Sequence, residues 1–214
     1  MRRDWILISV ILVLIGSSLS AQTLEGRSRV ELRLGMAVTV GADADVSAGG
    51  VSTDVSTGGF LGSVGFAYWL SEPWALSFSA GAVSINYDVS VGTFGVNTKT
   101  VIISRLLFGA RWYFVKSTLT KANRPYLALE AGPIVGSQSG VEIGTTVVTV
   151  NRDLTTVGGR LGFGYDFLLS NRWMLGLEGG FTAMADFSEE IAGKKNHSGP
   201  DFGVGISYLF GGRK

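Results

Sequence analysis

The sequence contains no cysteine, only one histidine and only four prolines in 214 residues. The absence of cysteine excludes disulfides and cysteine-ligated metal centres. Beyond the N-terminal segment no apolar run is long enough for a membrane-spanning helix, although hydrophobic residues make up 46% of the chain. Apolar residues spread in this way suit a membrane-spanning sheet, which must be closed because every backbone polar group in lipid needs a partner.

Residues 1–20 have the features of a secretory signal. Arg2 and Arg3 precede an apolar stretch at 5–15, and Ser18-Leu19-Ser20 forms a small-x-small cleavage site. The apolar stretch is too short to span a bilayer as a first transmembrane helix. We expect residues 1–20 to be removed on export and residues 21–214 to form one domain.

The charges of residues 21–214 are balanced. Residues 1–20 contain two of the 18 basic and one of the 17 acidic residues, so 16 of each sign remain. A balanced chain does not have the basic surface that nucleic acid requires as a partner.

Residues 29–41 alternate strictly between apolar and polar or small side chains. Neighbouring side chains in a strand point to opposite faces, so this segment is a strand with one apolar and one charged face. Similar segments recur along the chain and predict eight strands, at about 28–41, 59–70, 74–87, 99–115, 125–136, 155–168, 173–184 and 200–210. Two irregularities stand out: Pro133 predicts a β-bulge or the end of its strand, and a switch of apolar parity within 74–87 predicts a β-bulge.

The connections between these strands alternate in length. Short turns at 71–73, 116–124 and 169–172 alternate with long loops at 42–58, 88–98, 137–154 and 185–199. This layout predicts an all-β fold: an eight-stranded, antiparallel, up-and-down transmembrane β-barrel with short periplasmic turns and long extracellular loops. Two alternatives stay open, a ten-stranded barrel and a soluble exported barrel. The β-prone run at 145–150 predicts strands that extend above the membrane and offer an edge for strand addition, or a self-paired hairpin.

Aromatic residues gather near the short turns, as in the interface girdle of a membrane barrel. The predicted girdle consists of Trp74, Trp112, Tyr126, Phe167, Trp173, Tyr208 and Phe210.

Charged residues share the parity that faces away from lipid. The predicted interior network contains Glu31, Arg33, Arg105, Arg111, Glu130, Arg160, Asp166 and Glu178. From their positions on neighbouring strands, we expect Arg111 to form an ion pair with Glu130 and Arg160 to form one with Glu178. An eight-stranded barrel is just wide enough for side chains to fill it, and buried charges must be paired, so we expect a structural network rather than a conducting lumen.

No residue pattern predicts a catalytic or metal site. His197 lies in the last long loop near Ser198 and Glu189 or Glu190, where we expect a solvated loop residue rather than part of a Ser/His/acid triad. The aspartates at 43, 45 and 54 match no complete calcium loop. We therefore expect no catalytic residue, no metal and no cofactor.

The last predicted strand contains Gly205, Tyr208 and Phe210 in a Gly-x-x-aromatic-x-aromatic ending. With the eight alternating segments, this ending resembles the small outer-membrane β-barrels of the OmpA/OmpX type. The resemblance implies insertion by the barrel-insertion machinery, which reads Gly205, Tyr208 and Phe210, and a filled barrel with exposed loops. The ending departs from the pattern at Gly203 and in the residues after Phe210.

These observations predict a non-enzymatic, monomeric barrel in the lipid of the bacterial outer membrane, reached through the periplasm. Its extracellular loops would serve a surface, envelope-integrity or adhesion role by binding an extracellular ligand or a host cell surface. The alternatives are a narrow pore for small or apolar solutes and, with less support, a lipid-modifying enzyme.

Overall fold

The computed structural model describes residues 24–40, 51–55, 58–91, 96–114, 123–143, 147–191 and 194–211. The predicted signal, residues 1–20, lies outside these ranges and stays a prediction. The described residues form nine strands: β1 (Arg27–Val38), β2 (Val51–Val55), β3 (Gly58–Ser71), β4 (Trp74–Val91), β5 (Val96–Tyr113), β6 (Asn123–Ile143), β7 (Val147–Leu168), β8 (Trp173–Met184) and β9 (Gly199–Gly211). Among these residues, no helix is long and apolar enough to cross a membrane.

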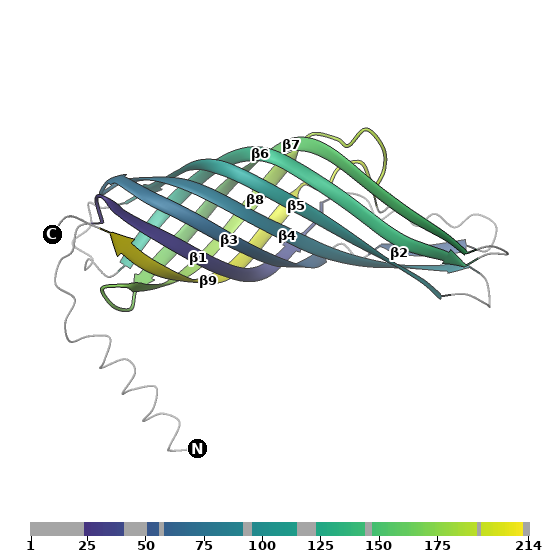
Figure 1. Ribbon diagram of the computed structural model, residues 1–214, viewed down its shortest axis with the longest axis horizontal. Coiled ribbons are helices and arrows are strands. Elements are labelled where there is room, and N and C mark those ends of the chain that lie inside the picture. Colours follow the sequence, from purple (N-terminus) through teal and green to yellow (C-terminus); the bar gives the residue numbers. More distant parts are fainter. Residues whose placement is uncertain are drawn as a thin grey trace, which may run out of the picture.

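Eight of the strands close into a barrel (Figure 1). Each strand pairs antiparallel with the next in the order β1, β3, β4, β5, β6, β7, β8, β9, and β9 pairs back onto β1 from Arg27↔Gly211 to Ala37↔Asp201. The short β2 pairs with β4 and lies outside this ring. The predicted eight-stranded antiparallel barrel is confirmed.

The alternation along β1 shows which face points outward. Val30, Leu32 and Leu34 are 45–51% exposed, whereas Arg29 is 0% and Glu31 is 5% exposed. The apolar face therefore lies on the outside of the barrel. In water this exposed apolar surface would be unfavourable, so it identifies the face that contacts lipid.

Neither predicted β-bulge is present. β4 keeps one register with β5 from Trp74↔Trp112 to Ser90↔Val96. The apolar residues of β4 therefore change from the outer face to the inner face, and Val83 and Ile85 lie inside the barrel. Pairing of β5 with β6 skips the two positions opposite Gly132 and Pro133 and then resumes in the same register. Proline interrupts the ladder because it has no N–H to donate, but the strand runs on.

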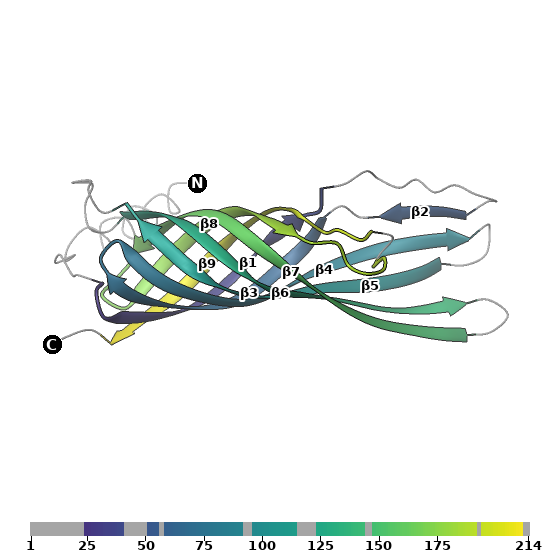
Figure 2. The ribbon, with the colours of Figure 1, turned by 90° about the horizontal axis from the view of Figure 1, so that it is seen from above.

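Two connections predicted as long loops are strand extensions, and the β-prone run at 145–150 predicted this for the second of them. β4 and β5 pair as far as Ser90↔Val96, and β6 and β7 pair as far as Ile143↔Val147. The wall formed by β4–β7 therefore extends well beyond the ends of β1, β3, β8 and β9 (Figure 2). We call this extension the tall wall, its end of the barrel the hairpin end, and the opposite end the turn end.

Candidate functional site: the barrel interior

Ten charged side chains from six strands form one network inside the barrel. Each of these side chains is at most 9% exposed. The network contains the eight predicted residues together with Arg29 and Asp201, which the sequence reasoning missed. Five arginines thus face five carboxylates, so the interior carries no net charge from these groups. The ten residues are Arg29, Glu31, Arg33, Arg105, Arg111, Glu130, Arg160, Asp166, Glu178 and Asp201.

Glu31 on β1 is one centre of the network. Its carboxylate lies 2.7 Å from Arg29, 2.5 Å from Arg33 and 3.0 Å from Arg111. The predicted neighbour of Arg111 was Glu130, but Arg111 instead contacts Glu31 and, at 3.7 Å, Glu178. Arg111 leans across the lumen to β1 and β8 rather than along the wall to β6.

Glu178 on β8 is the second centre. It accepts hydrogen bonds from Arg33 at 2.5 Å, from Arg160 and from the hydroxyl of Tyr126. The placement of Tyr126 in the interface girdle was wrong, because the ring is 1% exposed inside the barrel. Gly164 on β7 makes room for it, since a side-chain carbon there would overlap the Tyr126 ring. Tyr126 has the same strand parity as the interior residue Glu130, and this signal was available in the sequence.

The remaining carboxylates extend the network toward both ends. Asp166 accepts hydrogen bonds from Arg29 at 2.6 Å and from Tyr113 at 2.9 Å. Glu130 accepts one from Ser77 at 2.9 Å and lies 3.9 Å from Arg160.

Toward the hairpin end, Asp201 joins two arginines. Arg160 donates from Nε and Nη2 to the Asp201 carboxylate, with 2.6 Å for the shorter contact. Arg105 donates from Nη1 to Asp201 at 3.0 Å and to Thr182 at 2.9 Å. Asp201 shares the interior parity of the last strand, so alternation alone could have identified it.

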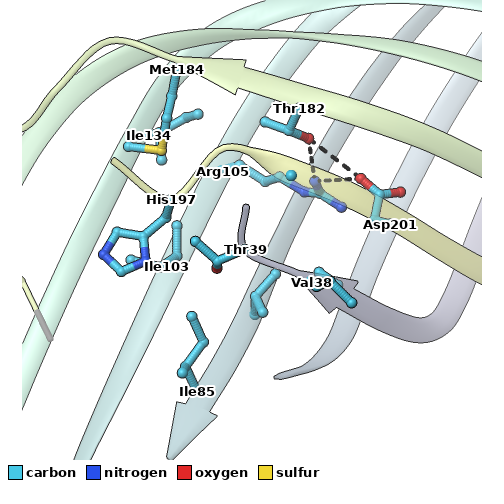
Figure 3. A pocket seen from close by; sticks show the side chains of 13 residues that line it. Val38, Thr39, Ile85, Ile103, Arg105, Ile134, Thr182, Met184, His197 and Asp201 are labelled. Carbon is cyan, nitrogen blue, oxygen red and sulfur yellow. Dashed lines mark hydrogen bonds and ion pairs between the residues drawn. The ribbon is translucent and has the colours of Figure 1, made fainter. Parts of the chain in front are cut away.

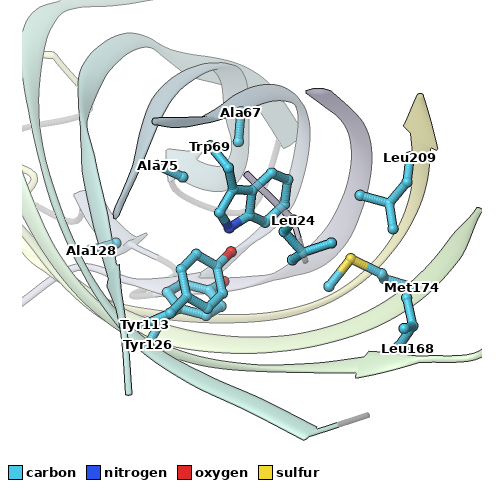
Figure 4. Packing of buried hydrophobic residues seen from close by; sticks show 10 residues of the cluster. All are labelled: Leu24, Ala67, Trp69, Ala75, Tyr113, Tyr126, Ala128, Leu168, Met174 and Leu209. Carbon is cyan, nitrogen blue, oxygen red and sulfur yellow. The ribbon is translucent and has the colours of Figure 1, made fainter. Parts of the chain in front are cut away.

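Packed apolar and aromatic side chains close the turn end below the network (Figure 4). Trp69 and Tyr113 pack at 5.6 Å between ring centroids, and Leu24, ahead of β1, is fully buried among them. Two arginines of the network lie over these rings, Arg29 over Trp69 at 5.5 Å and Arg111 over Tyr126 at 5.0 Å. Such cation–π contacts help to hold buried guanidinium groups in place.

The other six predicted girdle residues lie on the outward parity near the turn end. Trp74 and Trp112 are 48% and 43% exposed and stack on each other at 6.2 Å. Trp173 packs edge-on against Tyr208 at 5.1 Å. The set is completed by Phe167 and Phe210, which contact Tyr165 and Tyr208 respectively. Aromatic rings at this level suit the headgroup boundary of a bilayer.

At the hairpin end the interior changes from charged to apolar. We call this space the outer chamber; its wall is made by Leu61, Val83, Ile85, Val101, Ile103, Ile134 and Met184. Residues 185–191 and 194–198, which connect β8 to β9 and which we call the cap, fold over the chamber. Phe187 and Ile191 of the cap are 2% and 0% exposed and pack against this wall.

His197 belongs to the cap, and its prediction as a solvated loop residue was wrong. It is partly buried and its ring hydrogen-bonds the carbonyl of Ile191 at 2.9 Å. The cap does not assemble a triad around it. The hydroxyl of Ser198 accepts a hydrogen bond from the amide of Met184 at 2.9 Å, and Glu189 lies 2.7 Å from Arg152.

We expect acid to loosen the cap through His197. Burial lowers the pKa of His197, the hydrogen bond to Ile191 opposes this shift, and the positive charge of Lys194 adds to it. A closed cap therefore holds fewer protons than an open cap, in which His197 returns to its ordinary pKa, so closure weakens as the pH falls through about 6.5. Amide hydrogen exchange at Phe187, whose N–H bonds the Lys195 carbonyl at 2.7 Å, measures this opening. The acid effect should disappear in His197→Gln; an equal effect in this variant would assign it to another group.

The structure brings no metal cluster together within the part of the chain it describes. Asp43 and Asp45 lie outside the described residues, and the side chain of Asp54 is not described.

Several solved structures of bacterial outer-membrane proteins have a similar fold. The outer membrane protein OprG from Pseudomonas aeruginosa is 15% identical with a TM-score of 0.55, over 90% of this chain and 99% of that one. Ail, the attachment invasion locus protein of Yersinia pestis, was solved in complex with the heparin analogue sucrose octasulfate. It is 12% identical with a TM-score of 0.54, over 87% of this chain and 99% of that one. Neisserial surface protein A is 12% identical with a TM-score of 0.52, over 87% of this chain and 98% of that one.

No protein-family model matches the sequence, and neither does any curated protein. The structural likeness is to small outer-membrane β-barrels, as the alternating sequence predicted. The closed barrel and its outward apolar belt place the chain in the bacterial outer membrane.

Proposed function

We propose that this chain is a non-enzymatic surface protein whose barrel is a closed anchor and whose tall wall is the recognition element. The tall wall carries this proposal. β7 pairs with β8 only from Gly158 onward, so the part of β7 that begins at Val147 borders no second strand among the described residues. A free sheet edge presents backbone donors and acceptors to an incoming strand.

The interior supports an anchor rather than a pore. Ten paired charges fill the middle of the barrel, and opening an ion path would separate several of these buried pairs at once. The refolded barrel should be silent in a planar bilayer. Discrete conductance steps from the folded protein would favour the alternative of a narrow pore.

The test of the proposal removes the tall wall and keeps the barrel. In the native strain, a variant with β4–β5 and β6–β7 joined by short turns at the level of Tyr87 and Ser139 replaces the full chain. We expect it to assemble as a heat-modifiable barrel but to lose attachment to heparin-coated and protein-coated surfaces, as a strain without the chain does. Heparin is included because Ail was solved with a heparin analogue.

Detergent sensitivity of the same three strains separates the two surface roles. If the trimmed barrel keeps the envelope resistant but attachment is lost, the tall wall serves adhesion. If the trimmed variant equals the full chain in both attachment and resistance, the tall wall is not the recognition element and the proposal fails.

A further inference from the structure

The outer chamber is larger than its empty space indicates, because the cap occupies most of it. With the cap closed, about 30 Å³ remains between Ile85, Ile103, Arg105, Met184, His197 and Asp201 (Figure 3). That space holds about two water molecules. The side chains of Phe187 and Ile191 fill the remainder of the outer chamber. Another apolar group therefore has room in the chamber only when these two side chains move out.

The side-chain hydrogen bonds of the cap lie within the cap or reach the end of β8, and they are reversible in water. Asn196 donates to the carbonyl of Met184 and to Asp186, both at 2.9 Å, and His197 bonds Ile191. Among the described residues, the cap makes one ion pair to the wall, Arg152 with Glu189; it is solvent-exposed and therefore contributes little. Backbone hydrogen bonds tie the ends of the cap to Val40 and Val157. The apolar contact of the cap with the chamber comes from Phe187 and Ile191, and an apolar ligand can bury the same wall in their place.

The floor of the outer chamber contains an arginine with unused donors. The Arg105 side chain is 9% exposed and lines the remaining cavity. Both of its hydrogen bonds use Nη1, to Asp201 and Thr182, and among the described residues Nε and Nη2 have no partner. Nε and Nη2 lie on one edge of the guanidinium plane, the geometry that binds a carboxylate through two parallel hydrogen bonds.

We propose that the outer chamber is a binding site for a single-chain amphiphile with a carboxylate head. Its carboxylate binds Nε and Nη2 of Arg105, and its acyl chain takes the space of Phe187 and Ile191 against Ile85, Ile103 and Met184. The two displaced side chains contain about eleven carbon atoms together, so a chain of about ten carbons has the matching volume. This site is independent of the tall wall and of the function proposed for it.

The test uses the full-length barrel in lipid nanodiscs, where no detergent competes for the chamber. The probe is decanoate carrying ¹³C at its carboxyl carbon, and its ¹³C resonance is followed from pH 9 to pH 4. Decanoate dissolved in the bilayer has a raised pKa, whereas decanoate beside Arg105 stays ionised to lower pH. We expect a second, protein-dependent titration that lies below the lipid one.

Three variants decide the assignment. Arg105→Gln should weaken this binding about tenfold, the loss expected for charge-assisted hydrogen bonds. Phe187→Ala with Ile191→Ala should strengthen it several-fold, because the ligand no longer competes with the cap. Lys195→Gln removes an exposed cation of the cap outside the chamber and should change nothing. Heat modifiability on a denaturing gel confirms that each variant is folded.

Two results would overturn the proposal. One is a decanoate titration in protein-containing nanodiscs that equals that of empty nanodiscs, which leaves only the lipid-dissolved probe. The other is a protein-dependent signal that survives in Arg105→Gln and is equally displaced by decanol, which has the same chain without the carboxylate.

Discussion

Glu178→Gln is expected to lower the free energy of unfolding by about 3–5 kcal/mol, the cost of breaking a buried ion pair from one side. The substitution keeps the side-chain volume but removes the charge that Arg33, Arg111 and Arg160 share. These guanidinium groups lie in the middle of the barrel, where water cannot replace the lost carboxylate.

Urea titration of the barrel refolded into lipid vesicles, followed by tryptophan fluorescence, measures this loss. Glu189→Gln is the matched control: the same change at a carboxylate that is 59% exposed should cost less than about 0.5 kcal/mol. If the two variants are equally stable, the network is hydrated and holds the barrel far less than its geometry indicates.

Leu129→Arg is expected to destabilise the inserted barrel by about 2–4 kcal/mol. Leu129 is 68% exposed on the outer face of β6, among the apolar residues of the belt. A guanidinium at this depth lies in hydrocarbon without a partner, whereas the five arginines of the interior each have one.

The same vesicle titration tests this prediction. Leu169→Arg, in the turn after β7, should cost only about 0–1 kcal/mol because a long cation there reaches the headgroups. Equal costs at Leu129 and Leu169 would mean that Leu129 does not face the middle of the bilayer.

Most of what the sequence could predict follows from the alternation of side chains between the two faces of each strand. This alternation separates Val30, Leu32 and Leu34 from Arg29, Glu31 and Arg33, and pairing in the structure agrees with that division. The fold follows because a barrel needs only this two-fold pattern and its alternating connections.

Parity says which face a residue occupies but not which residue it meets across the lumen. The Arg111 side chain reaches Glu31 and Glu178 rather than Glu130, since an arginine is long enough to cross a narrow barrel. The apolar outer chamber was missed for a related reason. The β-bulge predicted within 74–87 would have turned Val83 and Ile85 toward lipid, whereas the structure keeps one register and buries both.

The network also determines when the barrel can become stable during assembly. The charges of β1 pair with residues far along the chain: Arg29 with Asp166, Glu31 with Arg111, and Arg33 with Glu178. β1 pairs with β9 as well, so the first strand to be made meets the last. Until that seam forms, these charges lack their partners on β5, β7 and β8 and must remain hydrated, and joining chain ends this far apart is slow. Release of water from the lumen and closure of the seam are therefore one late event, before which the chain is an open sheet with a wet, charged face.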